Sequence, residues 1–397
     1  MSQLNDAQAD AAASYIYYDL VVSNQQSDTV APQVFQFNEV RTSPFVDKPE
    51  DYELSIQRFT IDTGTLPVFI PTIQGDAASA DETIYSVTLA AYDSTGQAHV
   101  TWEPQDKTTP EPPLPSATHN GQQLNSTGYY NCYSYSWWCY LVYKASIAAK
   151  ADLVANSTGK TLVNANGDGF NSIDVNPPVF AWEVASNKAT IWAETQYFSE
   201  SLDAFGNRVR PSVEIFMNTS LFSLFGSFPF VLETYTAVDG MNVRIPVADL
   251  GKINEYTTPA DWLATVVQQE WSTMEAMTPI TSIVFTSNQL PIEPNQVSNP
   301  IVYLENKVLG RTSVNSATAN IITDLVSNSG LYKPNLVYVP SAQFRMITLY
   351  GNRKLYNLDL NIEYRLRNGE LVPFRLGSGG TVTMKIAFIK KKRKSWF

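Results

Sequence analysis

The sequence predicts a mainly β protein whose two terminal parts form a β-sandwich, and three observations support this fold class. Short stretches of alternating apolar and polar residues recur near both ends of the chain, separated by Pro and Gly. The composition is 44% hydrophobic and 12% aromatic, which is typical of a globular protein with a large core. The chain has 397 residues but only two cysteines, so we expect packing rather than disulfides to stabilise that core.

The first β-rich block begins after residues 1–14, which are small and polar and predict a flexible arm. We expect strands at 17–22, 34–37, 52–61 and 85–89. In the third of these the apolar positions change phase by one residue between Ile56 and Phe59. A one-residue change of phase is what a β-bulge produces, so we predict a bulge near Gln57 and Arg58.

The middle of the chain differs from the first block. Five prolines lie between Pro104 and Pro115, too many for a regular element, and we take this segment as the exit from the block. The stretch 129–155 starts with aromatic residues and becomes rich in alanine, which predicts a helix packed on a sheet. A second helix is predicted from Thr258, with Pro259 in its first turn. The apolar residues at helical spacing in this second segment are Leu263, Val266, Val267, Trp271 and Met274.

Strands return near Ile280, and the last forty residues contain the clearest pattern in the chain. Apolar residues occupy every second position of 358–367, which predicts a half-buried strand. Asn368 and Gly369 then supply the positive φ angles of a tight hairpin, and the returning strand is expected at 371–376. Three glycines between 377 and 380 predict a hinge between strands, and one more strand is expected at 381–388.

The charge distribution sets the C-terminus apart from the rest of the chain. The net charge is −11, yet five of the 27 basic residues stand together at the end of the last strand. These candidate binding residues are Lys390, Lys391, Lys392, Arg393 and Lys394. Three interpretations stay open for this tail, namely a solvated segment, a nuclear import signal, and a tether for nucleic acid or an acidic partner.

Residues that carry catalytic or metal chemistry are scarce. His99 and His119 are the two histidines, both expected in loops and neither with a partner at ligand spacing, so we predict no enzymatic activity, no metal and no cofactor. Cys132 and Cys139 match neither a redox motif nor a zinc motif. No apolar segment is long enough to cross a bilayer and no signal peptide begins the sequence, so we expect a soluble protein made inside the cell.

Two further patterns have an ordinary structural explanation. The segment 164–169 has Asn and Asp at alternate positions before a Gly, as in a calcium loop, but its twelfth position is Val175 and a surface turn explains it. Trp137, Trp138, Trp182 and Trp192 would suit glycan stacking, yet aromatic residues more often belong to a core or a subunit interface.

Several segments, taken together, resemble a known protein family. They are residues 37–39 and 43–45, the stretch 52–59 with 66–71, the stretch 282–287 with Leu290 and Pro291, residues 322–325, and the stretch 368–374 with 378–380. This set resembles the minor capsid, or penton, proteins of Polinton-like viruses and virophages. The resemblance covers about the first 75 and the last 120 residues, and none of its segments is a catalytic motif.

The resemblance implies a jelly-roll β-sandwich with a large mixed insertion domain. The expected domains are an arm at 1–14, the first part of the jelly roll at 15–101, the insertion at 102–278, the second part at 279–389 and the basic tail at 390–397. The implied function is a homopentamer at the fivefold vertices of an icosahedral double-stranded DNA virus. Its implied location is the virion, after synthesis in the host cytoplasm with nuclear import left open.

The implied partners are other copies of the chain and the trimers of the major capsid protein, with packaged DNA reached through the tail and a host receptor through the insertion. Three alternatives stay open at this stage, and the weakest of them is an enzyme on a β-sandwich, which would need acid–base residues that converge in one cleft. A major capsid protein would have two tandem jelly rolls and form trimers, and a host-attachment protein would bind glycans through the aromatic middle region.

Overall fold

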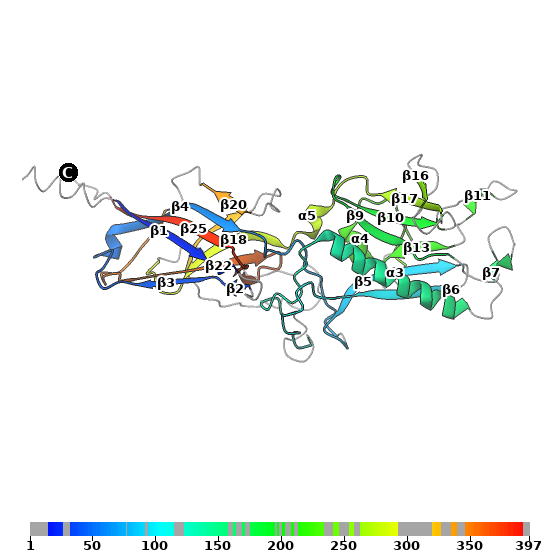
Figure 1. Cartoon of the computed structure of the whole chain (residues 1–397), viewed down its shortest axis with the longest axis horizontal. Coiled ribbons are helices and arrows are strands. Elements are labelled where there is room, and N and C mark those ends of the chain that lie inside the picture. Colours follow the sequence, from blue (N-terminus) through cyan, green and yellow to red (C-terminus); the bar gives the residue numbers. More distant parts are fainter. Residues whose placement is uncertain are drawn as a thin grey trace, which may run out of the picture. The chain divides into compact units, whose positions relative to one another are not determined.

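The computed structural model describes most of the chain (Figure 1). The described residues are 15–26, 32–76, 78–91, 94–114, 123–157, 162–163, 169–170, 175–194, 197, 201–202, 208–209, 213–233, 241–245, 254–257, 263–292, 320–326, 335–339 and 346–391.

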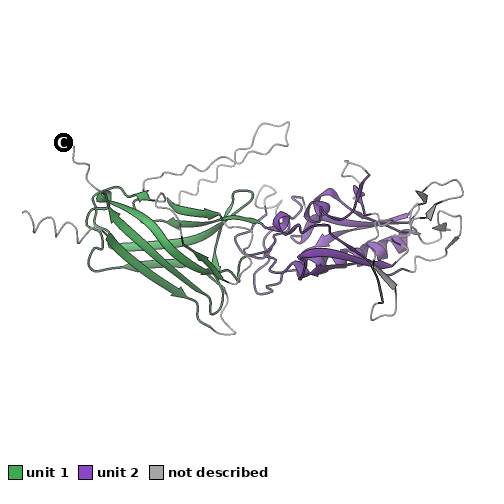
Figure 2. Ribbon diagram, turned by 90° about the horizontal axis from the view of Figure 1, so that it is seen from above, with its two compact units in different colours: residues 1–66, 279–397 green, residues 67–278 purple. Residues whose placement is uncertain are grey.

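The chain divides into two compact units, which Figure 2 distinguishes by colour. Unit 1 consists of Met1–Leu66 and Pro279–Phe397, and unit 2 consists of Pro67–Thr278. Unit 1 therefore brings together the two ends of the sequence, and unit 2 is inserted between them.

Unit 1 contains a sheet built on the last strand of the chain, which we call the β25 sheet. Its strands are β1 (Tyr15–Ser23), β25 (Thr381–Lys390), β4 (Tyr52–Asp62) and β20 (Asn335–Tyr338), in that spatial order, and β21 (Ile347–Thr348) also pairs with β4. All of these pairs are antiparallel, and β25 lies between two strands that come from the first block of the sequence.

The second large sheet of unit 1, the β22 sheet, faces the first across a shared core. Its strands are β19 (Asn320–Val326), β18 (Ile280–Ser287), β22 (Asn357–Leu366) and β23 (Leu371–Pro373), and β3 (Gln36–Val40) also pairs with β22. The rings of Phe59 in β4 and Phe285 in β18 lie 5.0 Å apart, so the two sheets contact each other through buried aromatic side chains. The predicted jelly-roll β-sandwich is thus confirmed for unit 1.

Local sequence features account for the details of these sheets. The strand expected at 358–367 is β22, with Leu358, Leu360 and Ile362 buried in the core. The predicted bulge is also confirmed, because Lys385 pairs with Arg58 while Ile386 pairs with Ile56, which leaves Gln57 as the extra residue. Gly369 has a φ of 84°, a left-handed conformation that glycine adopts without strain, and it closes the hairpin from β22 to β23.

Short elements complete unit 1. They are the β2 (Gln33–Val34) and β24 (Arg375–Leu376) pair and the 3-10 turn η1 (Pro49–Asp51). Pro373 is the last residue of β23. The glycine-rich segment 377–380 forms a turn between β24 and β25, as predicted, and Gly379 in this turn has a φ of 70°.

Unit 2 has two sheets of its own. One contains β16 (Asn254–Thr257), β17 (Leu263–Gln268), β10 (Lys188–Glu194) and β9 (Val179–Glu183). The other contains β14 (Val231–Leu232), β15 (Val243–Arg244), β13 (Glu214–Met217), β5 (Glu82–Ala91) and β6 (Ser94–Thr101). Two short pairs are also present, β7 (Leu162–Val163) with β8 (Gly169–Phe170) and β11 (Ser201–Leu202) with β12 (Arg208–Val209).

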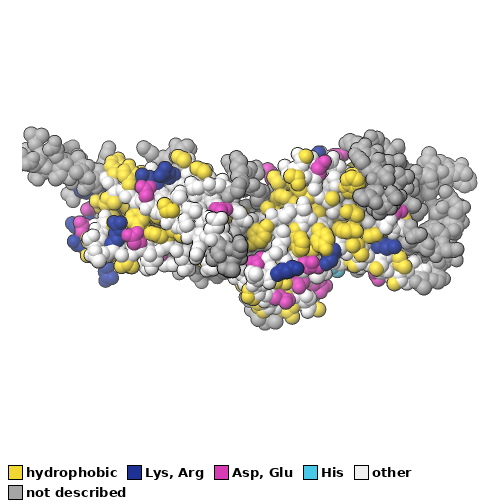
Figure 3. Space-filling view, in the orientation of Figure 1, with side chains coloured by type: hydrophobic (Ala, Val, Ile, Leu, Met, Phe, Trp, Pro, Cys, Tyr) yellow, Lys and Arg dark blue, Asp and Glu magenta, His cyan; other side chains and the backbone are white. Residues whose placement is uncertain are grey.

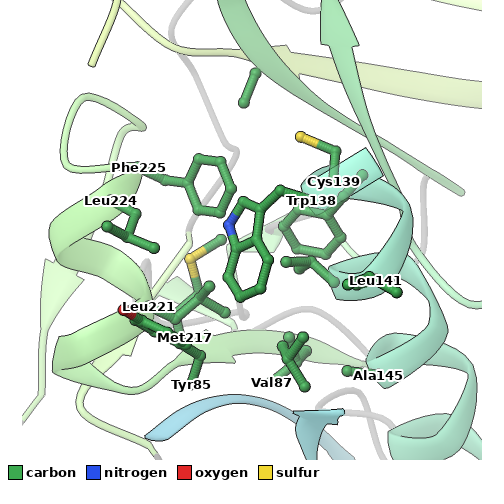
Figure 4. Close-up of a cluster of buried hydrophobic side chains, with 14 of the residues drawn as sticks. Tyr85, Val87, Trp138, Cys139, Leu141, Ala145, Met217, Leu221, Leu224 and Phe225 are labelled. Atoms are coloured by element: carbon green, nitrogen blue, oxygen red, sulfur yellow. The ribbon is translucent and has the colours of Figure 1, made fainter. Parts of the chain in front are cut away.

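A long helix, α3 (Tyr135–Ser157), packs on β5, β6 and β9. Trp138 is fully buried at its first turn, with the ring of Phe69 at 4.7 Å and that of Tyr85 at 5.2 Å. Figure 4 shows this cluster, to which β13 and the short helix α4 (Thr219–Leu224) contribute Met217 and Leu221. The helix expected at 129–155 therefore exists, packed on strands as predicted, and begins six residues later.

The structure corrects the helix that was predicted from Thr258. Leu263, Val266 and Val267 lie in strand β17, where Val267 pairs with Ile191 of β10 and is buried. Consecutive β-branched residues at 265–267 favour a strand and outweigh the helical spacing of the apolar residues. Trp271 follows the strand on the surface, and Met274 belongs to the short helix α5 (Met274–Met277).

Two other expectations differ from the structure. His99 was expected in a loop but lies in β6. The first part of the jelly roll was expected to reach residue 101, which is the end of β6. Strands β5 and β6 instead belong to unit 2, because their apolar face packs against α3. The change of unit falls between Leu66 and Pro67.

Candidate functional site

The predicted basic tail starts inside the β25 sheet. Lys390 is the last residue of β25 and pairs with Tyr52 of β4. The backbone N–H of Lys391 donates to the Asp51 carbonyl at 2.7 Å, and its Nζ donates to the Glu50 carbonyl at 2.7 Å. These bonds hold both lysines against the end of the sandwich, whereas Lys392, Arg393 and Lys394 lie outside the described residues.

The outer face of the β25 sheet, which we call the β25 face, exposes large apolar side chains. Tyr15, Tyr17 and Val21 of β1 are 57%, 58% and 67% exposed, and the two tyrosine rings stack with centroids 6.3 Å apart. Isolated exposed apolar residues are ordinary, but three on one strand make a surface that a partner would cover favourably. Figure 3 shows hydrophobic side chains among basic and acidic ones on unit 1.

Charged side chains stand beside those tyrosines on the β25 face. Asp19 of β1 lies 3.3 Å from Lys385 Nζ and 3.9 Å from an Arg58 guanidinium nitrogen. Lys385 Nζ also lies 5.2 Å from the centre of the Tyr17 ring, in reach of a cation–π contact. Two cations thus share one carboxylate, and Arg58 keeps 65% of its side chain exposed.

The outer face of the β22 sheet, the β22 face, carries an ion pair and a second acidic side chain. Arg365 pairs with Asp324 at 3.3 Å, and Glu363 stands on the same face of β22 two residues away. Burial raises the pKa of Glu363 above its ordinary value of 4.5. Its Oε2 is buried and accepts no hydrogen bond from the part of the chain that the structure describes.

Strand β1 also forms an edge of the sandwich. It has nine residues, pairs with β25 along its whole length and is the terminal strand of its sheet among the described residues. A long edge strand presents unpaired N–H and C=O groups, and native proteins cover or close such edges. This edge and the β25 face are therefore the candidate assembly surfaces of unit 1.

Unit 2 contributes a second type of exposed surface. Tyr140, Ile147 and Val154 recur every seven residues on the exposed side of α3, opposite the face that packs on the strands. Hydrophobic side chains are numerous on the visible face of unit 2 in Figure 3. Trp271, which follows β17, is 59% exposed.

The residues with reactive or ligating side chains occupy structural positions. Cys132 and Cys139 are free and buried, and burial raises the pKa of the Cys132 thiol to about 12, which opposes formation of the nucleophilic thiolate. His99 Nδ1 lies 3.1 Å from the Thr83 carbonyl oxygen. Among the described residues, no group of His, Cys, Asp and Glu is arranged to hold a metal ion. His119 and the calcium-like segment 164–168 lie outside those residues.

The tryptophans that invited a glycan hypothesis are mostly part of the core of unit 2. Trp182 stacks on Tyr135 with ring centroids 4.5 Å apart, and Trp137 Nε1 donates to the Glu103 carbonyl at 2.9 Å. Trp192 Nε1 donates to Thr190 Oγ1 at 3.1 Å. No helix in the described part of the chain is both long and apolar enough to cross a membrane.

Comparison with protein-family models identifies the family to which the chain belongs. The model described as Sputnik minor capsid protein V18/19 matches residues 16–390, which is almost the whole chain. The chain belongs to this minor capsid protein family. It is a structural protein of the virion, as the sequence resemblance implied, and the alternative of a major capsid protein loses its support.

Individual relatives of this minor capsid protein agree with that assignment. Structural protein V19 of the Sputnik virophage is 24% identical over 219 residues, which are 53% of this chain and 94% of the relative. A chain in the 3.5 Å cryo-EM structure of the Sputnik virophage matches with a TM-score of 0.73 and 24% identity, covering 95% of this chain and 98% of the other. The mavirus penton protein has the same fold, with a TM-score of 0.56, 16% identity and coverage of 95% and 99%.

Sequence reasoning located the tail but missed both outer faces of the sandwich. The tail was visible as a run of charges, whereas the β25 face combines Asp19, Arg58 and Lys385 from three distant segments. The strand register brings them together, and no local pattern in the sequence marks them.

Proposed function

We propose that this minor capsid protein forms homopentamers that close the fivefold vertices of an icosahedral double-stranded DNA virus and contact trimers of the major capsid protein. The observation that carries the proposal is the exposed edge and apolar outer face of β1 on a jelly-roll unit. A ring of copies covers such surfaces without leaving a free end, because a head-to-tail interface closes by rotational symmetry. The fold of the mavirus penton protein supports this choice of role.

Negative-stain electron microscopy of the purified full chain tests this proposal. We expect top views with fivefold symmetry, with the jelly-roll units around the axis. A Tyr17→Glu, Val21→Glu variant should lose these particles, because it places two charges on the apolar strand of the β25 face. Threefold top views of the unmodified protein would instead contradict the pentamer.

We also propose that the tail binds packaged DNA, a role supported by the sign of its charge. Lys390 and Lys391 are held by the sandwich, so the test replaces Lys392, Arg393 and Lys394 with Gln. Loss of three cations should lower the slope of log affinity against log salt by about 2 to 3 on duplex DNA. A charge-matched control replaces Lys48, Lys107 and Lys150, which lie elsewhere.

Equal salt slopes for the tail variant and the control would remove the DNA-binding role. If the tail variant of a fluorescent fusion then failed to enter the nucleus of a host cell, the import signal would be the better explanation. Unchanged binding and unchanged import together would leave the tail as a solvated segment.

Unit 2 is the part of the chain that we propose to contact the host receptor, and exposed Trp271 supports this role. An exposed indole is a common stacking surface for sugar rings. A glycan array probed with the full chain and with Trp271→Ala tests the proposal. Binding that the substitution abolishes would support it, and absence of binding to every glycan would contradict a glycan receptor.

A further inference from the structure

Helix α3 is rich in apolar residues on every side, which is unusual for a helix that has one side on the surface. Only three of its 23 residues carry a charged side chain, namely Lys144, Lys150 and Asp152. A surface helix normally places charged and polar residues on the side that faces water, and a helix that is apolar all round is normally covered all round. One side of α3 packs on β5, β6 and β9. Its composition therefore indicates that another molecule covers the opposite side.

The exposed side of α3 has the residue spacing of a contact between helices. Tyr140, Ile147 and Val154 keep 44%, 43% and 40% of their surface exposed and repeat every seven residues. Lys144 and Ala151 are exposed between them, so the spacing along this side alternates between four and three residues. Such spacing is that of a heptad seam, along which one helix packs against another. We therefore expect the covering element to be a helix.

The charged side chains of α3 do not oppose such a contact. Lys144, in the middle of the seam, forms an ion pair with Glu103 of the same chain. Asp152 Oδ2 accepts a hydrogen bond from the backbone N–H of Gln97 at 3.0 Å. Lys150 lies at the border of the exposed side, where a lysine can bury its aliphatic stem and keep its ammonium group in water. A polar residue at one central position of a seam also fixes the register of the helices.

The two borders of the exposed side differ in the size of their side chains. Half-buried Tyr143 and Lys150 form the large border, and exposed Ala148 and Ala155 form the small border. A helix turns by about 100° per residue, so the two borders point in directions roughly 140° apart. The heptad places them at the positions that meet between neighbouring parallel helices. In that arrangement Tyr143 of one copy lies over Ala148 of the next, and Lys150 lies over Ala155.

The unequal borders favour copies of this chain in a ring over a two-fold pair of helices. In an antiparallel pair each border meets its own equivalent, so the large side chains would collide and the small ones would leave a gap. A head-to-tail ring instead joins two different surfaces, so each large border meets a small one. The chain itself supplies the matching helix. Among its described helices only α3 can cover the seam, since α4 has six residues and α5 has four.

We propose that the α3 helices of neighbouring copies pack side by side and parallel in the pentamer, with the large border of each helix on the small border of the next. The proposal rests on the homopentamer and adds to it an assembly contact made by unit 2. Contact between the helices would cover Tyr140, Ile147 and Val154 and would give the apolar exposed side of α3 the partner that its composition indicates.

A charge placed in the seam tests whether it is buried between copies. Ile147→Glu should raise the concentration at which half of the chain is assembled by about 30-fold or more in sedimentation velocity, because a buried unpaired carboxylate is costly. Val184→Glu is the matched control, since it places the same charge on a residue of unit 2 that is 76% exposed and lies outside α3. The melting temperature of the unassembled subunit should stay the same for both variants, because both residues are exposed in a single copy.

Disulfide cross-linking tests the direction and the order of the helices. A double variant, Tyr143→Cys with Ala148→Cys, should form covalent ladders of up to five chains on a denaturing gel after oxidation with diamide. The two new cysteines cannot bridge within one helix, because their side chains point to different sides. Each single variant is a control that should stay at one chain, since the native Cys132 and Cys139 are buried.

The outcomes distinguish this proposal from the one on which it rests. If the unmodified chain forms no pentamer, the proposed function fails before any variant is compared. If it forms pentamers and Ile147→Glu assembles as well as Val184→Glu, the homopentamer stands and the contact between helices is wrong. Cross-linked products that stop at two chains would show a two-fold pair and overturn the ring of helices. A lower melting temperature of unassembled Ile147→Glu would also overturn the proposal, because Ile147 would then belong to the core of its own unit.

Discussion

Substitution of Gly96 by Ala should destabilise unit 2, because the backbone of α3 lies directly against β6 at this glycine. A Cβ added to Gly96 would lie 2.1 Å from the Ala149 carbonyl oxygen, 2.1 Å from the Leu153 nitrogen and 2.7 Å from Leu153 Cα. Ordinary contacts of a Cβ begin at 3.4 Å. The helix would have to move by on the order of 1 Å, and backbone atoms cannot rotate away as a side chain would.

The free-energy cost follows from the packing of the helix. Overpacking a core typically costs about 1–3 kcal/mol, and we expect the upper end or more because three backbone atoms of one helix are displaced together. For a unit of this size, about 3 kcal/mol corresponds to a fall in melting temperature of roughly 6–12 °C. The unfolding of unit 1 should stay unchanged, since Gly96 lies in unit 2.

Differential scanning calorimetry of the full chain measures both effects. The matched control is Gly226→Ala, also in unit 2, whose added Cβ would find its nearest atom, the Phe222 carbonyl oxygen, at 3.6 Å. That substitution should be neutral or should raise the free energy of unfolding by about 0.4–1 kcal/mol, because Ala lowers the conformational entropy of the unfolded chain. Equal melting temperatures for Gly96→Ala and Gly226→Ala would refute the close contact between α3 and β6.

Three further predictions concern buried groups. Since burial raises the pKa of Glu363 above 4.5, the unassembled subunit gains stability from this group below that pH and loses it as the pH rises through the folded-state pKa. Comparing unfolding curves of the unmodified chain and Glu363→Gln from pH 4 to pH 8 should show their difference growing in favour of the variant, and a constant difference would contradict the shift. Asp359→Ala should lower the free energy of unfolding by about 2–4 kcal/mol in chemical denaturation. The Asp359 carboxylate accepts hydrogen bonds from the backbone N–H groups of Asn288 at 2.7 Å and Gln289 at 3.1 Å, and from Ser287 Oγ. A loss below about 0.5 kcal/mol would contradict these bonds. The native protein should not react with a thiol reagent until it unfolds, because Cys132 and Cys139 are buried, and rapid modification of either would show that the core of unit 2 opens.

Alternating strands and their irregularities were predictable because side-chain direction repeats every two residues. The alternation before Asn368 predicted β22, and the phase change after Ile56 predicted the bulge at Gln57. Strand β17 was mistaken for a helix, since its apolar positions fit a helical period and only the strand β10 beside it decides between the two. Periodicity within a segment cannot reveal which neighbour it will pack against.

The boundary between the units and the candidate surfaces depended on contacts that no local pattern contains. Strands β5 and β6 look like a continuation of the first β-rich block until α3 is packed on them. Lys391 is a second example. In the sequence it looks like part of a charged tail, but in the structure its Nζ donates hydrogen bonds to the carbonyl oxygens of Glu50 and Leu349. The exposed β25 face and the unpaired Glu363 follow from strand register and burial, which appear only in the folded chain.

The mass of the assembled protein in native mass spectrometry tests the central proposal most directly. One chain has a mass of 44.2 kDa, and we predict a complex of five chains that persists when residues 392–397 are removed. A complex of three chains, or a single chain at every concentration, would contradict a pentameric penton.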